Sequence, residues 1–133
     1  DAFLATGHIS PEESLILCRE GRKRGVNMIL THPEFPRTRI GRDDQAELAK
    51  LGVVIEKNWF NLAQKSVMPE EMAETIRTVG SGHVYLATDR GQKGAPTPVS
   101  ELKRFIAVML TCGIAEAQIR DMVQKVPEEV VCR

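Results

Sequence analysis

The sequence predicts an α/β fold in which four parallel strands alternate with helices. Short apolar runs recur along the chain, and each is followed by a helix start signal. The apolar runs are continuous rather than alternating, which is typical of parallel strands that are buried on both faces of a sheet. Such strands are joined by right-handed crossovers. We expect residues 1–133 to form a single domain of this kind.

The first strand, predicted over residues 3–6, is followed by a strong helix start. Ser10 can cap a helix, Pro11 suits its first position, and Glu13 completes a capping box. This helix is expected to end before Gly25, since glycine is the residue that most often follows a helix.

The same signals place the remaining elements. The predicted strands span 26–31, 53–56 and 84–88, and the predicted helices span 43–51, 69–79, 97–111 and 115–125. Pro127 is expected to end the last helix, because proline lacks a backbone N–H. The residue before a proline favours extended geometry, so His32 is expected to be extended at a strand tip.

Composition excludes several classes of function. With 18 Lys and Arg against 18 Asp and Glu, the formal net charge is zero, so neither nucleic acid nor an anionic membrane is an expected partner. No apolar run approaches the roughly 20 residues of a membrane span. Cys18, Cys112 and Cys132 form no CxxC pair, which indicates neither a disulfide framework nor a zinc knuckle. A reducing, cytoplasmic location is the simplest interpretation.

Polar residues with useful chemistry follow the predicted strands. His8 follows the first strand, His32 the second, Glu56 and Asn58 the third, and Asp89 the fourth. The carboxyl ends of parallel strands share one edge, where the sites of such folds lie. Two imidazoles and a carboxylate at that edge can hold a metal ion. A single histidine there can equally be structural, and Glu56 can equally be a buried ion-pair partner.

The loop after the fourth strand is basic and contains glycines. In it, Arg90 and Gln92 are candidates for orienting an anionic substrate, although the loop is not a P-loop. Trp59 and Phe60 can form a substrate platform or simply cover a loop. His83 precedes its strand and is therefore expected at the opposite end of the sheet.

The segments TGHISPEE, ILTHPEF, VVIEKNWF and YLATDRGQ, followed by PVSELKRFIAVMLTCGI, carry a family resemblance. They resemble the carboxyl-terminal half of TIM-barrel metal-dependent hydrolases of the amidohydrolase superfamily, in an uncharacterised branch. The resemblance implies a (β/α)4 half-barrel, equivalent to strands five to eight, with an extra C-terminal helix. It also implies that His8, His32 and Asp89 bind a divalent metal, zinc or else manganese or iron, and that Asp89 and His32 are catalytic. The His-x-His pair and strand-four ligand of the superfamily are absent from the 133 residues.

A half-barrel exposes sheet edges and an apolar inner face, and both promote association. We therefore expect a homo-oligomer or a partner half-barrel chain; a sheet that flattens into a small sandwich is the other possibility. The predicted function is hydrolysis of a small amide, lactam or ester by metal-activated water. Glu56, Asn58, Arg90 and Gln92 are expected to bind the substrate. The alternatives are a non-catalytic half-barrel subunit or truncated remnant, and a small-anion binding module.

Overall fold

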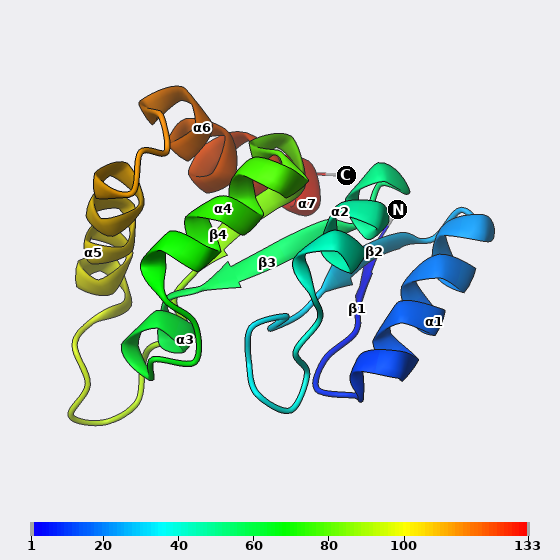
Figure 1. The fold of residues 1–133 in the computed structure, drawn as a ribbon, viewed down its shortest axis with the longest axis horizontal. Helices are drawn as coiled ribbons and strands as arrows, with labels where there is room; N and C mark the ends of the chain where they lie inside the picture. Colours follow the sequence, from blue (N-terminus) through cyan, green and yellow to red (C-terminus); the bar gives the residue numbers. More distant parts are fainter. Residues whose placement is uncertain (1, 133) are drawn as a thin grey trace.

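Four strands form one open sheet in the order β1-β2-β3-β4, and every neighbouring pair is parallel. The structure, a computed structural model, describes residues 2–132 and is shown in Figure 1. The strands are β1 (Phe3–Ala5), β2 (Asn27–Leu30), β3 (Val54–Asn58) and β4 (Val84–Ala87). The predicted α/β fold with a parallel sheet in sequence order is therefore confirmed.

Helices follow each strand, and their bounds match the sequence signals closely in the first two thirds of the chain. They are α1 (Pro11–Lys23), α2 (Arg42–Lys50), α3 (Trp59–Ala63), α4 (Pro69–Val79), α5 (Pro98–Thr111), α6 (Glu116–Arg120) and α7 (Val126–Val131). A short 3-10 helix, η1 (Ser81–His83), precedes β4, and a π-helical turn, η2 (Asp121–Lys125), joins α6 to α7. Helix α3 lies in a segment where the sequence indicated only a loop.

Helix α1 begins as its sequence predicts. The Glu13 backbone N–H donates to Ser10 Oγ at 3.2 Å, and the Ser10 N–H donates to Glu13 Oε2 at 3.0 Å. These two bonds satisfy N–H groups that the first helical turn leaves free. The Ser10 backbone N–H, and after it the Ser10 hydroxyl, lower the pKa of the Glu13 carboxyl by hydrogen bonding to it. The predicted capping box is confirmed.

Helices α1, α2 and α4 pack side by side against one face of the sheet, and Figure 1 shows α2 and α4 in front of β3 and β4. Most apolar strand side chains on that face are buried in the hydrophobic core, although Leu4 of β1 is exposed. The buried ones are Met28 and Leu30 of β2, Ile55 of β3, and Val84 and Leu86 of β4. Gly21 of α1 allows the close approach to β2, since a Cβ there would lie 2.5 Å from the Met28 sulfur.

The other face of the sheet differs from the prediction that the strands are buried on both faces. Phe3, Asn27 and Tyr85 are half-buried on this face, and Ala5 is exposed. Burial on this face increases toward the carboxyl end, where Glu56 is only 8% exposed. The continuous apolar runs therefore do not mean that both faces of the sheet are covered. On the second face, polar side chains become buried toward the carboxyl ends of the strands.

The C-terminal helices depart from the sequence expectation at Pro127. The predicted helix over 115–125 is split into α6 and the π-turn η2, and a further helix, α7, runs through Pro127. Pro127 lies in the first turn of α7, where a missing N–H costs no intrahelical bond. The proline therefore marks a new helix start rather than a stop. Among residues 2–132, no helix is both long and apolar enough to cross a membrane.

Candidate functional site

Side chains from three strand ends meet at the carboxyl edge of the sheet. His32 Nε2 lies 3.8 Å from Glu56 Oε1 and 3.9 Å from Asp89 Oδ2. The His8 and His32 rings lie 5.1 Å apart between centroids. Residues at or just after the carboxyl ends of β1, β2, β3 and β4 are therefore brought together, as the sequence predicted.

Three of the strands are each followed by a residue in the left-handed backbone conformation. The second residue after β1, β2 and β4 has a positive φ: 64° at Gly7, 50° at His32 and 50° at Asp89. His32 is thus not extended, contrary to the prediction from its proline neighbour, because the chain turns at this residue. Left-handed geometry is unfavourable for residues with a Cβ, and it concentrates at functional sites.

Glu56 is a buried carboxylate whose two oxygens are both held. Asn58 Nδ2 donates to Oε1 at 2.9 Å, and the Tyr85 hydroxyl donates to Oε2 at 2.8 Å. Tyr85 is the pairing partner of Glu56 in the β3–β4 register, so the two side chains leave the same face of the sheet. Burial and the neighbouring Glu56 carboxylate raise the pKa of Tyr85, which keeps its hydroxyl protonated.

Asn58 holds two neighbouring groups in place. Its amide nitrogen holds Glu56, and its Oδ1 accepts a hydrogen bond at 2.9 Å from the Phe60 N–H at the start of α3. With both ends engaged and only 1% of the residue exposed, Asn58 positions its neighbours.

Arg90 is anchored beside the cluster. Its Nε lies 3.3 Å from Glu101 Oε2, and its guanidinium lies 5.6 Å from the centroid of the Phe60 ring. Glu101, only 2% exposed, also accepts hydrogen bonds from Trp59 Nε1 and from Arg104. The loop after β4 is thus tied to α3 and α5. Trp59 and Phe60 serve this anchoring, which matches the covering role left open for them.

Gln92 acts on the turn at Asp89. Its side-chain Nε2 donates to the Asp89 backbone oxygen at 3.0 Å, so it braces the left-handed residue. The Asp89 carboxylate itself is open to solvent, with 45% of the side chain exposed. Of the predicted substrate-binding residues, Gln92 and Arg90 lie beside Asp89 on the same loop.

Two residues of the cluster were not predicted. Tyr85 holds Glu56, and the ring of Phe35 lies 6.1 Å from that of His32 and 6.3 Å from that of His8. Phe35 follows His32 in the same loop, but nothing in the sequence indicates that its ring packs back against the two histidines. Tyr85 could have been found from the sequence, because it lies directly beside Glu56 once the third and fourth strands are aligned.

The donor atoms suit a divalent metal in kind, but the described residues of one chain do not bring enough of them together for a complete site. Two atoms bound to one tetrahedral zinc ion lie about 3.4 Å apart, less than the 3.8 and 3.9 Å measured here. Among residues 2–132, no three His, Cys, Asp or Glu side chains are grouped closely enough to hold a metal ion. The imidazole of His32 is nevertheless short of a partner, since its Nδ1 is buried without a hydrogen bond.

His83 and the cysteines lie away from this cluster. His83 lines a hollow of about 210 Å³ together with Phe3, Asn27 and Val54, the first residues of β1, β2 and β3. The histidine is thus at the amino end of the sheet, as predicted. All three cysteines are free, in agreement with the absence of a disulfide framework.

Comparison with known proteins adds one finding. Residues 1–56 match a family of unknown function (DUF6282). The matched segment contains His8, His32 and Glu56 but not Asp89. No curated protein and no solved structure matches the chain. The resemblance to the amidohydrolase superfamily stays a prediction.

Proposed function

We propose that the carboxyl edge of this sheet is part of a hydrolytic site that acts on a small amide, lactam or ester with the help of a divalent metal. The observation that carries the proposal is the meeting of His32 with Glu56 and Asp89, which lie at the carboxyl ends of three different strands. Acid–base pairs of this kind are what hydrolysis of a carbonyl compound needs.

His8, His32 and Asp89 would hold the metal, zinc or else manganese or iron. When bound, such an ion lowers the pKa of water and polarises a carbonyl oxygen. The exposed Asp89 carboxylate is free to accept a proton, since only its backbone oxygen is engaged by Gln92. The Glu56 and Asp89 carboxylates both face Nε2 of the buried His32 imidazole, at 3.8 and 3.9 Å, so this nitrogen is the one that the two acids would share with a bound metal or substrate.

Glu56 and Arg90 shape the rest of the site. Glu56 is fixed by Tyr85 and Asn58, which keeps its carboxylate directed at His32. Arg90 follows Asp89 in the chain, and its Nε lies 3.3 Å from Glu101 Oε2, so its guanidinium is held at a fixed place on this loop. A substrate with an anionic group would be oriented by the positive charge of that guanidinium.

The proposal includes a second half-barrel. The open sheet is consistent with half of a (β/α)8 barrel, and the donors of one chain fall short of a complete metal site. A second copy of the chain, or a partner half-barrel, would bring further ligands to the same mouth. We therefore propose a homo-oligomer or a complex of two halves as the active form.

Metal content tests the proposal. The purified protein is loaded with zinc or manganese, dialysed and analysed for bound metal, beside His32→Ala and His83→Ala variants. We expect close to one ion per chain or per dimer in the parent and in His83→Ala, which alters the opposite end of the sheet. We expect loss of metal in His32→Ala. Asp89→Asn, which keeps the shape of the residue, should also lose metal if His32→Ala proves poorly folded.

A second candidate is a non-catalytic half-barrel subunit, and the wide spacing of the donor atoms favours it. The measurement of bound metal also distinguishes the hydrolase from the non-catalytic subunit. A parent protein that retains no metal after loading supports the subunit, and unchanged metal in the folded His32→Ala variant refutes the ligand assignment.

A further inference from the structure

A pocket of about 510 Å³ lies away from the strand-end site, between the loop after β2, the first turn of α2 and helix α4. Residues from Pro33 to Gln45 form one side of it, and Glu71, Glu74 and Thr75 of α4 form the other. None of the clustered residues of the proposed hydrolytic site lines it. Its volume is within the range of small-molecule sites.

Beneath the pocket lies a buried polar network. The ammonium of Lys57, a fully buried residue of β3, binds Glu34 Oε1 and donates to Gln45 Oε1 at 2.6 Å. Gln45 Nε2 in turn donates to the Ile40 carbonyl at 2.8 Å. Burial lowers the pKa of Lys57, although Glu34 opposes that shift. The network fixes the Glu34 carboxylate in place.

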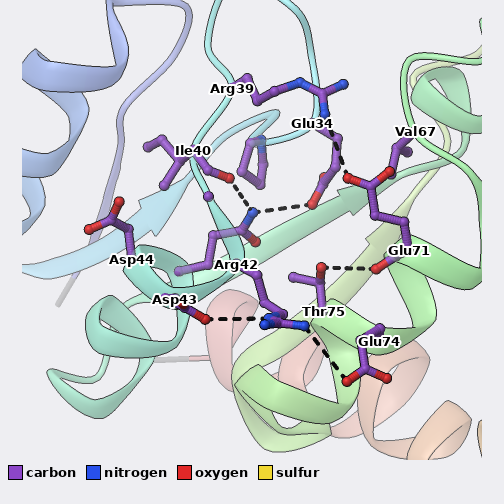
Figure 2. A pocket seen from close by; sticks show the side chains of 13 residues that line it. Glu34, Arg39, Ile40, Arg42, Asp43, Asp44, Val67, Glu71, Glu74 and Thr75 are labelled. Carbon is purple, nitrogen blue, oxygen red and sulfur yellow. Dashed lines mark hydrogen bonds and ion pairs between the residues drawn. The ribbon is translucent and has the colours of Figure 1, made fainter.

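One oxygen of Glu34 is left without a partner. Glu34 is only 5% exposed, and its Oε2 is buried with no hydrogen bond from any described residue. Buried carboxylate oxygens are normally satisfied, so an unpartnered one indicates a missing donor. In Figure 2 the carboxylate of Glu34 is directed toward the middle of the pocket, with Thr75 on the opposite side.

The cations that line the pocket are already engaged. Arg39 lies 3.6 Å from Glu71 and donates to the Ser66 carbonyl. Arg42 lies 3.3 Å from Asp43 and 3.8 Å from Glu74. Arg19 and Arg77 contact acidic residues of the pocket from outside it. None of these groups contacts Glu34 Oε2.

We propose that this pocket binds a small organic cation, an amine or guanidinium compound, whose N–H groups donate to Glu34. Five carboxylate residues and two arginines line the pocket, and Lys57, Arg19 and Arg77 pair with three of those acids from outside it. The choice of a cation therefore rests on Glu34 Oε2, an unpartnered carboxylate oxygen that accepts hydrogen bonds and would repel an anion. A bare metal ion fits less well, because no three acidic side chains among residues 2–132 are grouped closely enough to hold one. Pro33, Ile40 and Val67 offer apolar surface to a short carbon chain.

Calorimetric titration tests the proposal with putrescine and agmatine as probes, and with butanol and butyrate as neutral and anionic controls. We expect saturable binding of at least one of the two cations and none of the controls. A pocket that holds only solvent would show no saturable binding of either cation up to millimolar concentrations, and that result overturns the proposal. Equal binding of butanol also overturns it, because the charge would then have no role.

Variants locate the binding. Glu34→Gln should weaken cation binding at least tenfold, since a neutral amide cannot replace the carboxylate. Because this change leaves the Lys57 ammonium buried without its partner, the double variant Glu34→Gln with Lys57→Met removes both charges and should show the same loss. Glu12→Gln, an exposed change in the first turn of α1, is the matched control and should bind normally. Undiminished binding to the folded double variant would place the cation elsewhere and refute the assignment.

Discussion

His32 and Asp89 share one backbone conformation and face each other across the end of β3. Each has a φ of 50°, each is the second residue after its strand, and His32 Nε2 lies 3.9 Å from Asp89 Oδ2. Gly7 occupies the corresponding place after β1 with a φ of 64°. Three strands are thus followed by left-handed turns at the carboxyl edge, and in two of these turns the left-handed residue, His32 or Asp89, has a Cβ. This strain is retained where the side chains meet.

Substitution of Asp89 separates backbone strain from side-chain chemistry. Asp89→Gly relieves the left-handed geometry, whereas Asp89→Ala keeps it and loses the carboxylate. We expect the glycine variant to be more stable than the alanine variant by about 1 kcal/mol, because the left-handed conformation costs an L-residue roughly that much. Urea denaturation measures the difference. An alanine variant as stable as the glycine variant would show that no strain is held at this position.

The sequence predicted the parts of this fold that depend on local signals. The capping box at Ser10 and Glu13 marks the start of α1 because it needs only neighbouring residues. The four parallel strands follow from continuous apolar runs that alternate with helices. The meeting of His8, His32, Glu56 and Asp89 follows from topology alone, since parallel strands end at one edge.

What the sequence could not predict depends on registers and on long-range partners. Lys57 looks like a surface residue in sequence, yet it is fully buried, because Glu34 and Gln45 reach it from another part of the chain. The bond from the Phe60 N–H to Asn58 Oδ1 depends on helix α3, which the sequence did not indicate. Pro127 was expected to end a helix, and the π-turn before it allows a new helix to begin.

The Lys57–Glu34 pair should be costly to break and inexpensive to replace. Lys57→Met leaves the Glu34 carboxylate buried beside an apolar side chain, and removal of one partner of a buried pair costs about 3–5 kcal/mol. Adding Glu34→Gln removes the unpaired charge, so the double variant should regain a large part of that loss. The unfolding free energies of the parent, both single variants and the double variant form a cycle. A cycle with no coupling would mean that the two side chains act independently.

Assembly is expected because, in the part of the chain that the structure describes, both edge strands, β1 and β4, are paired on one side only and one face of the sheet stays open. Within residues 2–132, β1 pairs only with β2, and Ala5 is exposed on the face opposite the helices. A second half-barrel would pair with the β1 edge and cover that face. We expect sedimentation analysis to show a dimer or a larger species at micromolar concentration. A charged residue on that face, Ala5→Glu, should dissociate it, whereas Glu12→Gln should not. A clean monomer of the parent protein would count against completion of a barrel by a second copy.

Tyr85 gives a direct optical test of the Glu56 environment, because the sequence contains one tyrosine. Burial and the Glu56 carboxylate raise its pKa above the ordinary value of 10 in the folded protein. Near-ultraviolet absorbance of the phenolate should therefore show no titration of the folded chain around pH 10, whereas the chain unfolded in urea titrates normally.

The raised pKa of Tyr85 also sets how stability varies with pH. Above pH 10 the unfolded chain loses the phenol proton while the folded chain keeps it, so the unfolded state binds fewer protons and stability falls as the pH rises. The contribution is fully present below pH 10. Tyr85→Phe lacks this proton, so its stability should fall less steeply above pH 10 than that of the parent, by up to about 1.4 kcal/mol per pH unit. Below pH 10 the variant should be less stable, because Glu56 Oε2 loses its donor. Parallel stability curves for the two proteins above pH 10, or a normal phenolate titration in the folded state, would show that Tyr85 does not hold Glu56 as described.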